Sequence, residues 1–129
     1  MTDPYFAALD VLTATGAGQQ AERNRAAEVA PDFVKLAMSF TYGEILARPG
    51  LDLKSRTLAA VAAETAAGAA PERLHDHLRA ALHLGWTKAE LIEVIIQTAA
   101  YAGVPMALKA LSDCHELLVE RDPNCPTCD

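Results

Sequence analysis

The stretch Tyr-Gly-Glu-Ile-Leu-Ala-Arg-Pro-Gly-Leu-Asp, at residues 42–52, predicts two helices joined by a tight turn. Pro49 and Gly50 end the first helix, because proline disfavours a helical residue before it and glycine accepts unusual backbone angles. The aspartate that closes the stretch is expected to cap the next helix. Glu44 and Arg48 are four residues apart and would share one helix face. This pair either binds an anionic small molecule or is an ordinary surface ion pair, which contributes little stability.

The composition favours helices throughout the chain. Hydrophobic residues make up 51% of the 129 residues, but aromatic residues make up only 5%. Alanine supplies much of the hydrophobic count. Chains rich in alanine and leucine favour closely packed helices. No alternating strand pattern competes, so an all-α protein is predicted. We expect one domain over residues 1–121 and a short proline-rich tail over residues 122–129.

Start and stop residues place the helices. Asp3 and Pro4 form a helix start, and Thr87 with Glu90 forms a capping box. The alanine-rich fourth helix is expected to be the most buried. The predicted helices cover about residues 4–15, 19–29, 33–47, 53–67, 71–84, 88–101 and 105–120.

Charge and patterning also restrict the partners and the location. The net charge of −6, without a basic stripe, argues against nucleic-acid binding. The N-terminus lacks the features of a signal peptide, and no apolar run reaches the ~18 residues that a membrane span needs. We therefore expect a cytoplasmic protein that binds neither nucleic acid nor membrane.

The helix expected over residues 71–84 carries three histidines. His77 borders its apolar stripe, His75 lies closer to solvent, and His83 is the third. An imidazole suits proton transfer near neutral pH, but a histidine beside an apolar stripe is often a packed or capping residue. Both interpretations of His77 stay open. His75 and His77 cannot share one helix face, so no metal site is predicted there.

Two other helices carry polar residues in apolar surroundings. Glu93, Gln97 and Tyr101 follow one face of the helix over residues 88–101. They form either a hydrogen-bond network at a helix or subunit contact or the wall of a pocket. Glu64 lies within the alanine-rich helix, where it either pairs with a cation across helices or has a raised pKa. Arg56 is the nearest arginine on roughly the same face.

The three cysteines do not describe a secreted disulfide framework. Cys125 and Cys128 form a C-x-x-C in the tail, and Cys114 is followed by a histidine. Reactive C-x-x-C pairs usually lie at a helix start, unlike this one. We therefore favour an incidental tail motif over a redox or metal role.

Three segments occur in a distinctive order and spacing. They are residues 42–52 with Arg56, then His77-Leu-Arg-Ala-Ala-Leu with Gly85 and Glu90, then Glu93-Val-x-x-x-Gln97-x-x-x-Tyr101-Ala-Gly-Val-Pro-x-Ala107. Together, over about residues 30–120, they closely resemble the γ-carboxymuconolactone decarboxylase family of the alkylhydroperoxidase-D-like superfamily. The resemblance implies an all-α bundle of about six to seven helices. It also implies a homo-oligomer, either a hexamer built as a trimer of dimers or a trimer.

The resemblance further implies a decarboxylase that needs no cofactor. Its substrate would be a carboxylated unsaturated lactone, such as γ-carboxymuconolactone, in the catabolism of aromatic compounds. Loss of carbon dioxide leaves a dienolate, which is then protonated. The residue roles expected for this chemistry are Arg48 and Arg56 as clamps for substrate carboxylates, His77 as hydrogen-bond or proton donor to the enolate, Glu44 as acid or orienting group for His77, Tyr101 as a further donor, and Glu93 as a support for Tyr101 or an arginine.

The sequence departs from its superfamily at two places. The C-x-x-C of the peroxidase branch would fall on Ala70 and Arg73, so a thiol mechanism is not expected there. Glu64 stands where the decarboxylases are usually apolar, and an extra acid would repel a polyanion. Two alternatives remain: a thiol-dependent peroxidase or disulfide reductase that uses Cys125 and Cys128, and a non-catalytic oligomeric ligand-binding protein.

Overall fold

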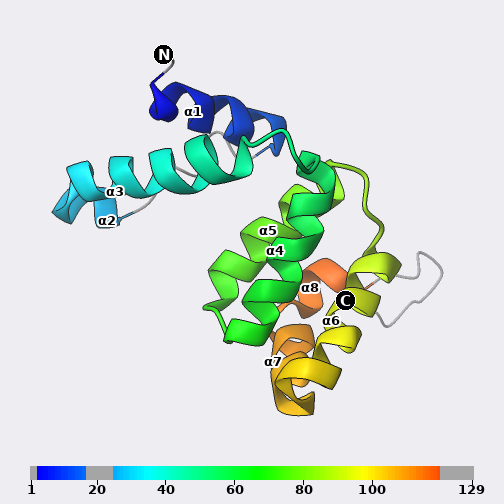
Figure 1. Cartoon of the computed structure of the whole chain (residues 1–129). Coiled ribbons are helices and arrows are strands. Elements are labelled where there is room, and N and C mark those ends of the chain that lie inside the picture. The colour runs from blue at the N-terminus through cyan, green and yellow to red at the C-terminus, as the bar shows by residue number, and fades with distance from the viewer. Residues whose placement is uncertain (1–2, 17–24, 120–129) are drawn as a thin grey trace, which may run out of the picture. The chain divides into compact units, whose positions relative to one another are not determined.

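The computed structural model describes residues 3–16 and 25–119, and every regular element in these ranges is helical (Figure 1). This confirms the all-α prediction. None of the described helices has both the length and the apolar character that crossing a membrane requires. The elements are α1 (Pro4–Ala14), α2 (Ala26–Val29), α3 (Pro31–Met38), the π-helix η2 (Ser39–Leu46), α4 (Leu53–Ala67), α5 (Pro71–His83), α6 (Lys88–Ala102), α7 (Val104–Asp113) and α8 (His115–Leu118).

Local capping explains why helices begin where the sequence predicts. The Asp3 carboxylate accepts a hydrogen bond from the backbone N–H of Tyr5 at 2.9 Å, at the start of α1. At α6, the Thr87 hydroxyl accepts from the Glu90 N–H at 3.1 Å, and the Glu90 carboxylate accepts from the Thr87 N–H at 3.0 Å. This reciprocal pair is the predicted capping box. The predicted helical residues 19–24 and the predicted tail, residues 122–129, lie outside the described residues.

The helix predicted over residues 33–47 consists of two elements with different winding. The α-helix α3 gives way to the π-helix η2, in which backbone hydrogen bonds span five residues instead of four. Glu44 lies inside η2, whereas Arg48 lies beyond its end. Within the described residues no ion pair joins Glu44 to Arg48, so the predicted surface ion pair is not formed. The alternative, binding of an anionic small molecule, stays a prediction.

The chain divides into two compact units, residues 1–57 and residues 58–129, with the boundary inside α4. In the first unit α1 packs against η2, and Ala8 and Leu12 of α1 are buried. Gly43 of η2 lies directly against the backbone of Pro4. A Cβ atom at Gly43 would overlap the Pro4 carbonyl oxygen and lie 2.7 Å from its carbon. The close approach of these helices thus depends on glycine.

Replacing Gly43 by alanine is expected to lower the free energy of unfolding by about 1–3 kcal/mol, because the added methyl group must push two backbones apart. An alanine in place of a helical glycine would otherwise stabilise the chain by about 0.5–1 kcal/mol, so the sign of the change is informative. Gly50→Ala is the matched control, since nothing lies within 4 Å of the added methyl group. Urea denaturation of both variants measures the effect. Equal or greater stability of Gly43→Ala would contradict this packing.

The second unit has a core built from α4 to α8. Leu78, Leu91 and Ile95 are among its largest fully buried side chains. One residue of this core belongs to α4, three belong to α5, and α6 and α7 supply two each. The last two are the residue before α8 and a residue within it. The members are Val61, Leu74, Leu78, Ala81, Leu91, Ile95, Ala107, Ala110, Cys114 and Leu118. The helix α4 buries Val61 and two threonines, whereas α5 buries four residues, so α4 is not the most buried helix that the sequence predicted.

The single helix predicted over residues 105–120 is interrupted. The helix α7 ends at Asp113, Cys114 leaves helical geometry with φ −106° and ψ 16°, and the short helix α8 follows. Nε2 of His75 on α5 lies 2.8 Å from the Asp113 carbonyl oxygen and can donate to it. In a continuous helix that carbonyl would accept from the N–H four residues later. The contact from α5 thus supplies a partner that lets the helix break, and it gives His75 a structural role.

Candidate functional site

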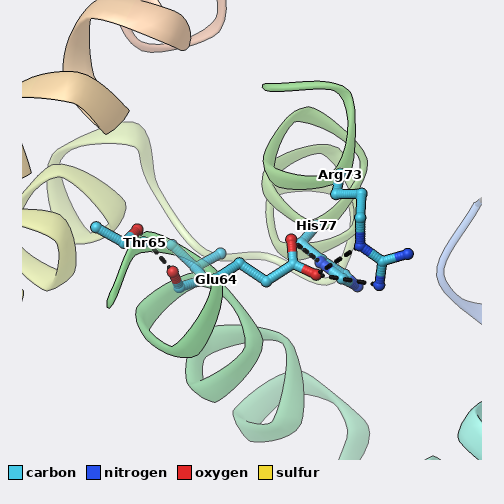
Figure 2. Close-up of polar contacts among 5 residues, drawn as sticks. Glu64, Thr65, Arg73 and His77 are labelled. Atoms are coloured by element: carbon cyan, nitrogen blue, oxygen red, sulfur yellow. Dashed lines mark hydrogen bonds and ion pairs between the residues drawn. The ribbon is translucent and has the colours of Figure 1, made fainter. Parts of the chain in front are cut away.

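The most connected polar cluster of the described residues joins α4 to α5. Glu64 extends from α4 toward Arg73 and His77, which both belong to α5 (Figure 2). Arg73 and His77 are four residues apart, so they lie on the same face of that helix. Pro71 is the first residue of α5 and sets the start of the turn that carries Arg73.

Each carboxylate oxygen of Glu64 has its own neighbour from α5. Oε2 lies 2.8 Å from Nδ1 of His77, and Oε1 lies 3.2 Å from Nη2 and 3.3 Å from Nε of Arg73. The side chains of Glu64 and His77 are only 14% and 17% exposed, whereas that of Arg73 is 65% exposed. The ring of His77 is not well aligned with Oε2, so this is a close polar contact and not a well-formed hydrogen bond.

The environment of Glu64 favours its ionised form. Burial alone would raise the pKa of this carboxyl, but the contacts with His77 and with Arg73 outweigh burial, and the pKa is lowered. The expected ion pair across helices is therefore confirmed, and the alternative of a raised pKa is wrong. The arginine involved is Arg73, not Arg56.

Replacing Glu64 by glutamine is expected to lower the free energy of unfolding by about 1–3 kcal/mol at neutral pH, because a largely buried charged contact is lost. The carboxyl has a lower pKa in the folded than in the unfolded chain. Its contribution is therefore complete above its ordinary value of 4.5 and is lost as the pH falls through the folded value. The difference between wild type and Glu64→Gln should shrink on acidification.

Urea denaturation at several pH values measures this difference. Glu72→Gln is the matched control, since Glu72 is exposed on α5 and has no ion pair among the described residues. Its stability relative to wild type should change little across the same range. A deficit of Glu64→Gln that stays constant or grows toward low pH would contradict the role of the ionised pair.

The turn between η2 and α4 is stabilised by its own residues. Asp52 caps α4 as predicted, accepting from the Ser55 N–H at 3.0 Å and from the Ser55 hydroxyl at 2.7 Å. The guanidinium of Arg56 donates from Nε to the Leu51 carbonyl at 3.0 Å and from Nη2 to the Arg48 carbonyl at 3.1 Å. Arg56 therefore holds the turn, which leaves fewer of its N–H groups for a ligand. Arg48 itself is exposed.

The polar stripe of α6 lies at the surface of the single chain. Glu93 and Gln97 are exposed, and Tyr101 is 85% exposed. Among the described residues none of the three has a hydrogen-bond or ion-pair partner. The two predictions for this stripe, a contact network or a pocket wall, both require something to cover it, and both stay predictions.

The sequence-predicted site residues belong to different units. Glu44, Arg48 and Arg56 lie in residues 1–57, and His77, Glu93 and Tyr101 lie in residues 58–129. Their convergence around one ligand stays a prediction. Arg73 was not among the predicted residues. Its spacing of four from His77, opposite an unusual acid on the preceding helix, is the pattern that indicates it.

Cys114 is fully buried at the junction of α7 and α8. Burial raises the pKa of its thiol to about 11, and the neighbouring Asp113 carboxylate acts in the same direction. Thiolate is the reactive form, and this site disfavours it. Within the described part of the chain, no group of three or more potential ligands is placed to hold a metal ion. Cys125 and Cys128 lie outside the described residues.

We expect Cys114 to resist alkylation in the folded protein. At pH 8 a thiol with a pKa of about 11 is ionised in only about one molecule in a thousand, and its burial excludes the reagent as well. Peptide mapping after iodoacetamide treatment should find Cys114 unmodified in native protein and modified in urea. Similar rates in both conditions would show that the thiol is accessible.

Comparisons with known proteins point to one family. The model of the family described as "Carboxymuconolactone decarboxylase family" matches residues 31–112. The chain is 38% identical over 86 residues to a 4-carboxymuconolactone decarboxylase of Acinetobacter baylyi, covering 67% of this chain and 63% of that protein. It is 32% identical over 77 residues to a nitrosuccinic acid decarboxylase of Metarhizium robertsii, covering 60% and 53%.

A third relative is an uncharacterized 15.0 kDa protein of Paracoccus denitrificans, 38% identical over 82 residues, with 63% of this chain and 61% of that protein covered. The chain thus spans less than two thirds of the length of each of these curated relatives. The family match covers more than half of the chain, and the protein belongs to the carboxymuconolactone decarboxylase family.

Proposed function

We propose that the protein is a cofactor-free decarboxylase of a small carboxylated molecule whose departing electron pair is accepted by a neighbouring electron-withdrawing group. A carboxylated unsaturated lactone such as γ-carboxymuconolactone, from the catabolism of aromatic compounds, is the first candidate. Family membership supports this proposal, as do two relatives named as decarboxylases of different acids. Both acids contain a group that can accept electrons, a lactone carbonyl in one and a nitro group in the other.

The reaction needs an electron acceptor and a proton. The bond between the carboxylate carbon and the substrate carbon breaks, and its electron pair moves into the conjugated carbonyl as carbon dioxide departs. The resulting dienolate then forms a C–H bond with a proton delivered by an acid of the protein. That acid regains its proton from water, so no net oxidation or reduction occurs. A group that stabilises the enolate oxygen or donates the proton lowers the barrier.

His77 is the residue that we propose for proton delivery, and its environment is the observation that carries the proposal. Its side chain is mostly buried, and Nδ1 is enclosed against Glu64. Among the described residues Nε2 has no hydrogen-bond partner. One nitrogen is therefore held by the protein, while the other remains available to a substrate. This is the arrangement expected of a histidine that acts as general acid.

The other predicted residues complete the proposal. Arg48 would bind a substrate carboxylate, as guanidinium groups do through paired N–H donors. Arg56 would contribute with the N–H groups that the turn does not use. For the remaining three, the proposed roles are a supplementary acid for Glu44, a hydrogen-bond donor for Tyr101, and a support for Tyr101 or an arginine for Glu93.

Carbon dioxide release tests the proposed function directly. The purified protein, with a chelator and without added cofactor, is offered a panel of carboxylated muconolactones and nitrosuccinic acid. The matched negative substrate is a saturated lactone acid, which lacks the conjugated electron acceptor. Release above the uncatalysed rate from an unsaturated acid but not from the saturated one is the expected result. No release from any member by folded protein would count against the proposal.

We also propose that the chain works in the cytoplasm as a homo-oligomer, a hexamer or a trimer. Several large apolar side chains of α6 and α7 are exposed in the single chain, among them Ile96 at 48%, Val104 at 59% and Leu108 at 60%. Association would bury such side chains. Analytical ultracentrifugation gives the mass in solution, and a monomer at micromolar concentration would argue against this part of the proposal.

A further inference from the structure

Among the described residues, Glu64 is the charged group that contacts Nδ1 of His77, the ring nitrogen other than Nε2. The carboxylate comes from α4 and the imidazole from α5, so two helices fix their separation at 2.8 Å (Figure 2). Both contacting atoms are enclosed. Without a proton on Nδ1, two electron-rich atoms would lie 2.8 Å apart in a buried place, which is repulsive even though the ring is not aligned with Oε2. The contact therefore favours the proton on Nδ1.

We propose that Glu64 is the positioning residue of His77: it keeps a proton on Nδ1 and thereby makes Nε2 the nitrogen that exchanges a proton with the substrate. This inference rests on the proposed function. When Nε2 is also protonated, the carboxylate balances the charge of the imidazolium, and when Nε2 has given up its proton the neutral ring keeps the tautomer needed to regain one from water. Glu44, the predicted orienting group, is not needed for this task.

Arg73 makes this arrangement compatible with an anionic substrate. It binds Oε1, the oxygen that His77 does not contact, and so it fixes the rotation of the carboxylate. It also compensates the negative charge that Glu64 adds. With His77 protonated, the three side chains carry one negative and two positive charges. With a neutral ring, Glu64 and Arg73 cancel. In neither state does the cluster carry a net negative charge that would repel a carboxylated substrate.

Nitrogen NMR of His77 tests the proposal without relying on activity. The ¹⁵N shifts of a neutral imidazole distinguish a proton on Nδ1 from one on Nε2, and the spectrum of His77→Ala identifies the signals. In wild type the neutral ring should carry its proton on Nδ1. In Glu64→Leu, which removes the acceptor, the form with the proton on Nε2 should become populated. Glu72→Gln should match wild type in both spectrum and rate.

Kinetics of the same variants separate positioning from a purely structural role. We expect Glu64→Leu to lower kcat at least about tenfold with little change in KM, since proton transfer and not binding is affected. Glu64→Gln keeps the shape but offers a single acceptor oxygen, which the donor-only guanidinium of Arg73 needs, so the amide N–H groups would face Nδ1 of His77. In this variant too the form with the proton on Nε2 should become populated and kcat should fall, and it serves as the second variant if Glu64→Leu does not fold.

Three results would overturn the inference. One is a wild-type ring with its proton on Nε2. Another is a folded Glu64→Leu with unchanged tautomer, and the third is a folded Glu64→Leu with unchanged kcat. Failure of the proposed function is distinguishable from these results. A wild-type protein with the proton on Nδ1 that releases no carbon dioxide from any acid of the panel would overturn the catalytic assignment while leaving the contact with Glu64 established.

Discussion

Replacing His77 by alanine is expected to lower the turnover number by at least ~10²-fold, the usual scale for losing a group that transfers a proton in the rate-limiting step. The variant would still bind its substrate, because the proposed role of His77 concerns the enolate that forms after binding. KM should therefore change much less than kcat. The experiment measures carbon dioxide release under saturating and subsaturating substrate for wild type and variant.

The same helix provides a control for this variant. His83 is an exposed residue of α5 without a hydrogen bond or ion pair among the described residues, so His83→Ala should leave turnover unchanged. Removing His77 also leaves Glu64 without one of its two polar neighbours on α5, which costs some stability. Circular dichroism and urea denaturation must therefore show that His77→Ala is folded at the assay temperature. A folded His77→Ala with wild-type turnover would remove this residue from the mechanism.

The sequence predicts the helices of this protein well where capping chemistry is local. Helices start at the expected places after Asp3 and Thr87, because each side chain accepts a hydrogen bond from an N–H of the first turn. At α5 no side chain caps the start, and Pro71 fits the first position because its φ is fixed and it has no N–H to satisfy. The prediction is wrong where a contact from elsewhere decides. The break after Asp113 depends on a hydrogen bond from His75, a residue 38 positions earlier.

The winding of η2 and the buried face of α4 could not be predicted from the sequence. Apolar spacing over a few residues does not distinguish a π-helix from an α-helix, so the sequence could not show that regular winding changes at Ser39 and ends before Arg48. The alanine-rich segment that became α4 has apolar side chains on every face. Periodicity therefore could not identify which face is buried, and only Val61 joins the core.

The candidate site divides in the same way. The sequence predicts His77 as a site residue, both through the family resemblance and through its place beside an apolar stripe. Glu44 as an orienting group for His77 stays a prediction, because the two residues belong to different units. The contact of Nδ1 with Glu64 joins two helices and is not visible in residue spacing. Glu64 was singled out as an unusual acid, and the structure explains it through Arg73 and His77. An unexpected charge in an apolar helix thus indicated a contact before its partners could be named.

Replacing Arg48 by alanine is expected to raise KM by about ten- to a hundredfold while kcat changes little, because a charged hydrogen bond to a substrate carboxylate is worth about 1.5–3 kcal/mol. The guanidinium of Arg48 has no hydrogen-bond or ion-pair partner among the described residues, and the residue is exposed. Its removal should therefore leave the free energy of unfolding within about 0.5 kcal/mol of wild type. Arg48→Lys keeps the charge but loses the paired donors, so its KM should lie between those of wild type and Arg48→Ala.

Arg56→Ala is the informative comparison, because Arg56 adjoins the same turn but uses its N–H groups on the carbonyl oxygens of Leu51 and Arg48. Arg56→Ala should lower the free energy of unfolding, and any rise in KM should occur together with this drop in stability. A binding arginine and a turn-stabilising arginine thus give opposite patterns in paired measurements of KM and urea denaturation. If Arg48→Ala lowers kcat at unchanged KM, Arg48 acts in the chemical step and not in binding. If it destabilises the chain as Arg56→Ala does, its effect on activity follows from the turn, and the proposed carboxylate clamp has to be sought elsewhere.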